Sequence, residues 1–167
     1  ILSFSGIAQT YNVPATGTSE INVCTGTVLD PGGNGNYGTN HDGILIIDPP
    51  GGGTVTLDFS LFQIENTWDD LFIHDGRGTG APQIGAYTGT GSPGIVTSTA
   101  GAITLHFESD GSGVDVGFEA TISVNEAPLA VGTISPGGAT DYCVGGDVTL
   151  NYSPGSDAIQ QWQVSTD

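Results

Sequence analysis

The fold class can be decided from one stretch of the chain, Leu57-Asp-Phe-Ser-Leu-Phe-Gln-Ile-Glu-Asn-Thr-Trp-Asp-Asp-Leu-Phe-Ile-His-Asp-Gly76. Apolar and polar residues alternate with a period of two on either side of the turn around Asn66, which is typical of two β-strands. On the second strand this alternation points Leu71 and Ile73 toward the core. Phe72 and His74 are then expected to face outward.

The same alternation recurs along the chain in short runs that are bounded by Gly, Pro, Asn or Asp. The 167 residues include 28 Gly and 9 Pro, scattered without a fixed period. Many short strands with regular turn signals and no helical period predict an all-β antiparallel sandwich or jelly roll. We expect strands over residues 20–24, 44–47, 54–59, 70–74, 83–87, 102–107 and 117–122.

The charge balance is strongly acidic and limits the possible partners. There are 18 Asp and Glu against one base, Arg77, which gives a formal net charge of −17. A chain with one cation cannot neutralise a row of phosphates, which excludes nucleic acid and anionic membrane surfaces as partners. Metal cations, basic proteins and neutral sugars remain as ligands. Alternatively, the charge serves only to keep a surface protein soluble.

The ends of the chain differ from its middle. Residues 1–8 read either as the remnant of a signal peptide, with a cleavage site after Ala8, or as a first edge strand. Residues 9–125 form the main predicted domain. No run is long enough for a transmembrane helix, and we expect an extracellular protein, secreted or on the cell surface, without direct membrane insertion.

The strand pattern starts afresh near Asn125. Cys143 followed about 20 residues later by Trp162 is the order found in immunoglobulin-like sandwiches, where the tryptophan is core. Such a domain needs about 100 residues. Residues 126–167 are therefore predicted to be the first strands of a partial immunoglobulin-like domain, with further sandwich domains continuing in the same chain.

Acidic residues gather at the predicted strand ends. Glu65 and Asp69 lie four residues apart across a turn, and Asp110 lies in a later turn, Glu108-Ser-Asp-Gly-Ser112. Carboxylates brought together repel one another unless a cation or protons intervene, and hard oxygen ligands of this kind suit Ca²⁺. The alternative is that these are ordinary solvated loops.

Segments of the chain resemble a CUB domain. They are residues 24–27, 30–37, 62–76, 84–89, 96–99, 103–112 and 117–120, and they occur in the order of that family over about residues 20–124. The chain looks most like CUB modules of secreted and cell-surface proteins of Bacteroidetes-type bacteria, a setting of type IX secretion and gliding motility. The resemblance implies a jelly-roll sandwich of two antiparallel sheets.

The resemblance also implies a calcium site. By position its ligands are Glu65, Asp69 and Asp110, with oxygens of residues 111–113 as additions and Ser112 as the named candidate. Tyr37 matches a family tyrosine close to the site. We expect its hydroxyl to donate a hydrogen bond there rather than to bind the ion, since a neutral phenol is a poor calcium ligand.

The chain departs from the family pattern at several positions. Asp70 replaces the usual aromatic residue and is a candidate fourth carboxylate, or a substitute for Asp69. Thr67 and Thr88 stand at positions where many members carry cysteines. Cys24 therefore lacks its family partners, so it is either free or bonded to Cys143 across the domain boundary.

Catalysis is not expected. No His-x-His or Cys/His ligand spacing is present, so zinc is not expected from the sequence, and no serine has a histidine and an acid in a known catalytic order. Asp69 and Asp70 cannot act as a glycosidase pair, because adjacent residues of a strand point to opposite faces.

The sequence thus predicts a non-catalytic extracellular module, with Ca²⁺ as its cofactor, of a larger adhesin that binds a basic or lysine-bearing protein surface. Trp68 is either a loop anchor or an exposed contact residue. The alternatives are glycan binding through outward-facing Trp68, Phe72 and Tyr87, a targeting module of a secreted hydrolase, and a structural spacer of an extracellular filament.

Overall fold

The computed structural model describes residues 9–125, in which every regular element is a strand. The predicted signal remnant or edge strand over residues 1–8 and the predicted immunoglobulin-like segment, with Cys143 and Trp162, lie outside the described residues. The strands are β1 Thr10–Asn12, β2 Thr16–Ile21, β3 Thr25–Leu29, β4 Asp42–Ile47, β5 Thr54–Gln63, β6 Asp70–Asp75, β7 Gln83–Tyr87, β8 Ile95–Thr97, β9 Ile103–Glu108 and β10 Gly117–Asn125.

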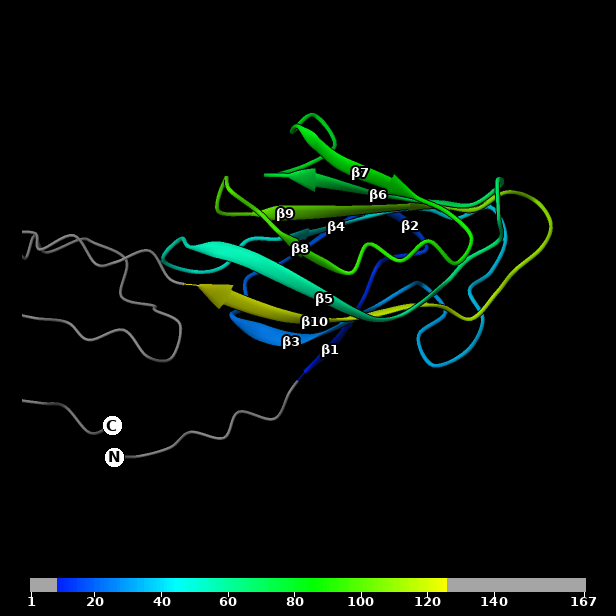
Figure 1. Cartoon of the computed structure of the whole chain (residues 1–167), viewed down its shortest axis with the longest axis horizontal. Coiled ribbons are helices and arrows are strands. Elements are labelled where there is room, and N and C mark those ends of the chain that lie inside the picture. The colour runs from blue at the N-terminus through cyan, green and yellow to red at the C-terminus, as the bar shows by residue number, and fades with distance from the viewer. Residues whose placement is uncertain (1–8, 126–167) are drawn as a thin grey trace, which may run out of the picture.

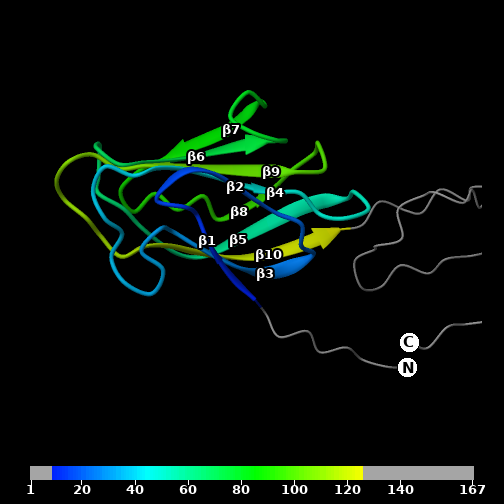
Figure 2. The same ribbon diagram turned by 180° about the vertical axis from the view of Figure 1, so that it is seen from behind.

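Two five-stranded sheets pack face to face (Figures 1 and 2). Their strand orders are β1-β3-β10-β5-β8 and β2-β4-β9-β6-β7. All pairings are antiparallel except at one edge of each sheet, where β1 joins β3 and β2 joins β4 in parallel. This confirms the predicted jelly-roll sandwich, and it follows from many short alternating strands that must each bury one face.

The core lies between the two sheets and is built from the alternating apolar residues. Leu71 and Ile73 of β6 are fully buried, as the alternation predicts, and so is Phe107 of β9. Phe107 and Phe118 cross edge to face, with ring centroids 5.9 Å apart, and Phe118 stacks on Phe62. These rings join the two sheets and fix the ends of the strands that carry the acidic loops.

The observed strands match most predicted ranges, and β7 matches residue for residue. Three short strands, β1, β3 and β8, were not among the expected elements. Strand β2 ends at Ile21, so the predicted strand over residues 20–24 is wrong in its second half. The two edge strands β1 and β8 have only three residues each, which is too short for a period-two pattern to stand out.

Two outward-facing aromatic predictions are wrong. His74 is only 7% exposed, because the segment between β6 and β7 covers it and the Ala81 carbonyl oxygen lies 3.1 Å from its Nδ1. Tyr87 lies opposite Leu71 across the β6–β7 pair, so it shares the inward face and packs against the core.

Candidate metal centre

Three loops meet at one end of the sandwich and carry the predicted acids. Glu65 lies in the turn between β5 and β6, Asp69 immediately precedes β6, and Asp110 follows β9. Each offers a carboxylate oxygen, and the three oxygens lie within 4.8 Å of one another. Since β6 and β9 are paired neighbours, the ends of these two strands place Asp69 beside Asp110.

Asp69 is fully buried and organises the other two acids. Its Oδ1 accepts the Asp110 amide hydrogen at 2.9 Å, and its Oδ2 accepts the Tyr37 hydroxyl hydrogen at 2.5 Å. The Tyr37 oxygen in turn accepts the Glu65 amide hydrogen at 2.8 Å. Burial and the bond to the Asp69 carboxylate raise the pKa of Tyr37, so its hydroxyl keeps the proton that it donates.

The turn between Glu65 and Asp69 has a strained backbone. Thr67 has a φ of 80°, a left-handed conformation that is costly for a β-branched residue. Its amide hydrogen is donated to Thr88 Oγ1 at 2.9 Å, and the Thr88 hydroxyl is 2.8 Å from the Asp69 carbonyl oxygen that accepts its hydrogen. Thr88 therefore holds both the strained residue and the residue that precedes β6.

In the part of the chain that the structure describes, no Lys or Arg compensates the charge of the three carboxylates. Burial, followed by the charges of Asp110 and Asp69, raises the pKa of Glu65. Glu65 Oε2 is buried and has no hydrogen-bond partner among the described residues. Arg77, the single Lys or Arg of the sequence, follows the far end of β6 and pairs with Glu20 at 2.6 Å and with Asp48.

The structure separates Asp70 from this group. Asp70 is the first residue of β6, and its side chain points to the face opposite that of Asp69, so it is not among the three converging carboxylates. Burial and the Asp69 charge raise the pKa of Asp70. The Ser112 amide hydrogen is donated to Asp110 Oδ1 at 2.8 Å, which shapes the turn that carries Asp110.

The remaining predicted residues lie at different depths. The Trp68 side chain is 65% exposed, which favours the contact-residue interpretation over the loop anchor. Phe72 is half-buried beside His106, with ring centroids 5.7 Å apart. Cys24 is disulfide-bonded rather than free. Cys143 lies outside the described residues, and a bridge between the two cysteines stays a prediction.

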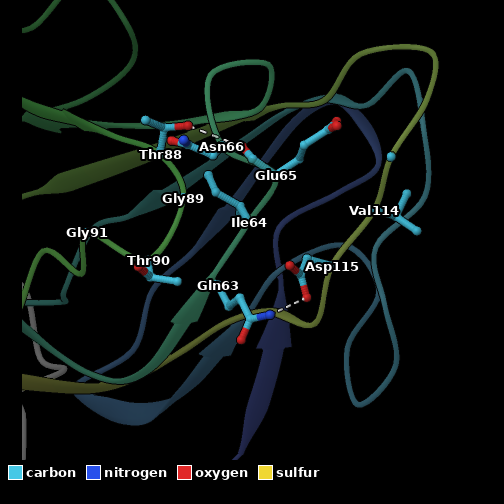
Figure 3. A pocket seen from close by; sticks show the side chains of 11 residues that line it. Gln63, Ile64, Glu65, Asn66, Thr88, Gly89, Thr90, Gly91, Val114 and Asp115 are labelled. Atoms are coloured by element: carbon cyan, nitrogen blue, oxygen red, sulfur yellow. Dashed lines mark hydrogen bonds between the residues drawn. The ribbon is translucent and has the colours of Figure 1, made fainter.

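Sequence reasoning missed a pocket of about 540 Å³ that borders the acidic group. Figure 3 shows Gln63, Ile64 and Glu65 from β5 and the following turn on one side, with Val114 and Asp115 of the β9–β10 segment nearby. Gln63 closes one end by donating a hydrogen bond to Asp115 at 2.7 Å. The pocket is formed by segments that are distant in sequence, so no local sequence motif predicts it.

Known proteins resemble this chain in both sequence and fold. The family model described as "CUB domain" matches residues 17–122, more than half of the chain. The chain belongs to the CUB family. Domains of this family are generally non-catalytic interaction modules. Among the described residues, no helix has the length and apolar character needed to cross a membrane.

Cubilin of Canis lupus familiaris is 34% identical over 105 residues, which are 58% of this chain and 3% of cubilin. The bone morphogenetic protein 1 homologue of Strongylocentrotus purpuratus is 30% identical over 143 residues, 83% of this chain and 22% of that protein. The chain therefore corresponds to a small part of these relatives.

Two solved structures share the fold. The MASP-1 CUB2 domain bound to Ca²⁺ is 26% identical, with a TM-score of 0.55, over 63% of this chain and 96% of that domain. The full extracellular region of zebrafish Gpr126 has a TM-score of 0.58 and 19% identity, over 66% of this chain and 15% of that region, and it supports the fold alone.

The Tyr37 hydroxyl provides a first test of the site. Tyr37→Phe leaves a buried carboxylate oxygen of Asp69 and the Glu65 amide without their shared partner. We expect the free energy of unfolding to fall by about 1–3 kcal/mol in urea denaturation. Tyr87→Phe is the control, because the Tyr87 hydroxyl makes no hydrogen bond among the described residues. Equal stability of the two variants would contradict the role given to Tyr37.

The Glu65 carboxyl provides a second test, in calcium-free protein. The pKa of Glu65 is higher in the folded protein than in the unfolded chain. The protonated carboxyl therefore stabilises the fold at a pH below the ordinary pKa of about 4.3, and this contribution is lost as the pH rises through the folded-state pKa. We expect the free energy of unfolding of Glu65→Gln to rise above that of the wild type over the pH range in which Glu65 ionises, and the difference to remain constant up to neutral pH. Urea denaturation from pH 3.5 to 7 measures it. Glu119→Gln, on the other sheet, is the control, and a parallel gain there would contradict the assignment.

Proposed function

We propose that this chain is a non-catalytic, calcium-binding CUB module of a larger extracellular protein, and that it binds a protein partner. The observation that carries the proposal is the buried Glu65 Oε2, which has no hydrogen-bond partner among residues 9–125 and has two further carboxylates within 4.8 Å. A buried carboxylate oxygen without a partner is costly, and a bound cation removes that cost.

The donor set fits calcium. Glu65, Asp69 and Asp110 supply three carboxylate oxygens, and Ca²⁺ takes oxygen ligands in a flexible shell that turn carbonyls, a serine hydroxyl and water can complete. Ser112 is the candidate for the hydroxyl. When bound, calcium would offset two of the three negative charges, while the Tyr37 and Thr88 hydrogen bonds keep the loops in place before it arrives.

The surface around the acidic group favours a basic partner. Trp68 is exposed in the turn between Glu65 and Asp69, and the net charge of −17 attracts lysine- or arginine-bearing proteins. An exposed tryptophan beside a charged site is a common anchor of protein interfaces. We infer that the chain is part of an adhesin that is either secreted or held at the cell surface. CUB homologues are extracellular or secreted proteins, which supports that location.

Glycan binding has weaker support than protein binding. Of the three aromatic residues that could stack on a sugar, Tyr87 packs inward and Phe72 is half-buried against His106. Trp68 alone of these three is prominently exposed, which leaves no platform of adjacent rings.

Calcium titration tests the metal. We expect calorimetry on the wild-type chain to give one site with a Kd of about 10⁻⁵ to 10⁻³ M, and ten times that concentration to stabilise the fold by about 1.4 kcal/mol. Asp110→Asn keeps the acceptor for the Ser112 amide but removes the charge, and should abolish both effects. Asp58→Asn removes an exposed charge from β5 and should leave both unchanged. A wild type with neither heat nor thermal shift would remove calcium from the proposal.

A binding array tests the partner. Extracellular proteins and glycans are probed in parallel with the wild type and Trp68→Ala, in calcium and in chelator. We expect protein hits that weaken when their lysines are acetylated, when calcium is removed, or when Trp68 is replaced. Binding to glycans alone, or protein binding that none of these three changes weakens, would contradict the proposed calcium-dependent binding of a basic protein.

A further inference from the structure

The outer face of the sheet β2-β4-β9-β6-β7 carries a row of acids at its loop end. Glu108 of β9 lies directly opposite Asp42 of β4 on one side and opposite Asp70 of β6 on the other. Opposite residues of antiparallel strands share a face, and like charges placed there destabilise the sheet. Arg77 pairs with Glu20 and Asp48 at the other end of β6, so no Lys or Arg of the chain neutralises this row.

His106 stands within this row. It precedes Glu108 by two residues on β9, which puts both side chains on the outer face. Its Nε2 lies 2.8 Å from Asp42 Oδ1 and 3.3 Å from Glu108 Oε1. The Phe72 ring packs against the imidazole, whose side chain is 16% exposed, whereas those of Asp42 and Glu108 are 72% and 49% exposed. The ring is thus held in place while both carboxylates remain reachable from solvent.

From this geometry we propose that Asp42, His106 and Glu108 form a second metal site, which binds a divalent transition-metal ion of the Zn²⁺ type. One ligand atom from each lies within 4.8 Å of the others. Metal–ligand bonds of 2.0–2.2 Å in a tetrahedron place ligand atoms about 3.3 Å apart. The two nitrogen–oxygen distances, 2.8 and 3.3 Å, need only a small adjustment to reach that spacing.

The ligand chemistry separates this site from the calcium candidate. An imidazole nitrogen suits Zn²⁺, Ni²⁺ or Cu²⁺, whereas calcium prefers an all-oxygen shell such as that of Glu65, Asp69 and Asp110. Strand alternation keeps the two groups apart, because Asp69 points inward and Asp70 points to the outer face. Three protein ligands leave a fourth position open, where water or a side chain of a partner can bind the ion.

The alternative is that the His106 Nε2–H donates hydrogen bonds to the two carboxylates with no metal. The two arrangements differ at Nε2, which carries a proton in the hydrogen-bonded arrangement and binds the ion in the metal site. Zinc titration of the full chain, followed by calorimetry and by the imidazole ¹⁵N resonances, distinguishes them. Calcium is kept saturating so that the Glu65 group does not compete for zinc.

We expect one zinc ion per chain in the wild type, with a large shift of the His106 Nε2 resonance. His106→Gln should weaken zinc binding about 100-fold or more, and Asp42→Asn and Glu108→Gln should each weaken it at least tenfold. Asp58→Asn, which removes a charge from the other sheet, and Asp110→Asn, which removes one from the calcium candidate, should leave zinc affinity unchanged.

Circular dichroism of each variant establishes that it folds, and an unchanged calcium-induced thermal shift in His106→Gln shows that the two sites are independent. No zinc binding by the wild type, or binding that survives His106→Gln, would overturn the proposal. Zinc affinity lost equally in Asp58→Asn would also overturn it, since the ion would then be held by net charge alone.

Discussion

The Asp69 carboxylate is fully buried, and its two oxygens accept hydrogen bonds from Tyr37 and from the Asp110 backbone. Through these bonds one side chain joins the start of β6, the end of β9 and the segment before β4. A charge removed from water needs such partners, since an unpaired buried carboxylate costs several kcal/mol. The loops at this end are therefore fixed relative to one another by Asp69, and the positions of Glu65 and Asp110 follow from it.

Strand alternation divides the acids of this end into two groups with different surroundings. Asp69 and Asp70 are neighbours in sequence, yet one is buried with Tyr37 and the other lies in the outer row with Glu108. The inner group has only oxygen donors, and the outer group includes an imidazole. A period of two along one strand thus produces two chemically distinct clusters a short distance apart. The same rule excludes Asp69 and Asp70 as a pair acting on one substrate bond.

The sequence predicts most of the fold and part of the site. The alternation around Leu71 and Ile73 predicts their burial, and Glu65, Asp69 and Asp110 are found at strand ends that the structure brings together. Short strands such as β1 and β8 give too few residues for a period to be recognised. His74 was misplaced because burial there depends on a loop that folds over an outer face, which alternation does not describe.

Contacts between distant segments account for the rest. The cluster of Asp42, His106 and Glu108 depends on the register of β4 against β9, and a one-residue slip would place the two acids on opposite faces. The pocket beside Glu65 likewise depends on three segments meeting. Neither spacing along the chain nor composition contains this information.

The hydrogen bond from the Thr67 amide to Thr88 has a consequence for where such a module can work. These two threonines stand at positions where the family resemblance leads one to expect cysteines. The Thr88 hydroxyl holds the strained turn through a hydrogen bond, and a hydroxyl does not react in thiol–disulfide exchange. This contact therefore holds the turn between Glu65 and Asp69 without a bond that reduction could break, in a domain whose Cys24 is itself disulfide-bonded.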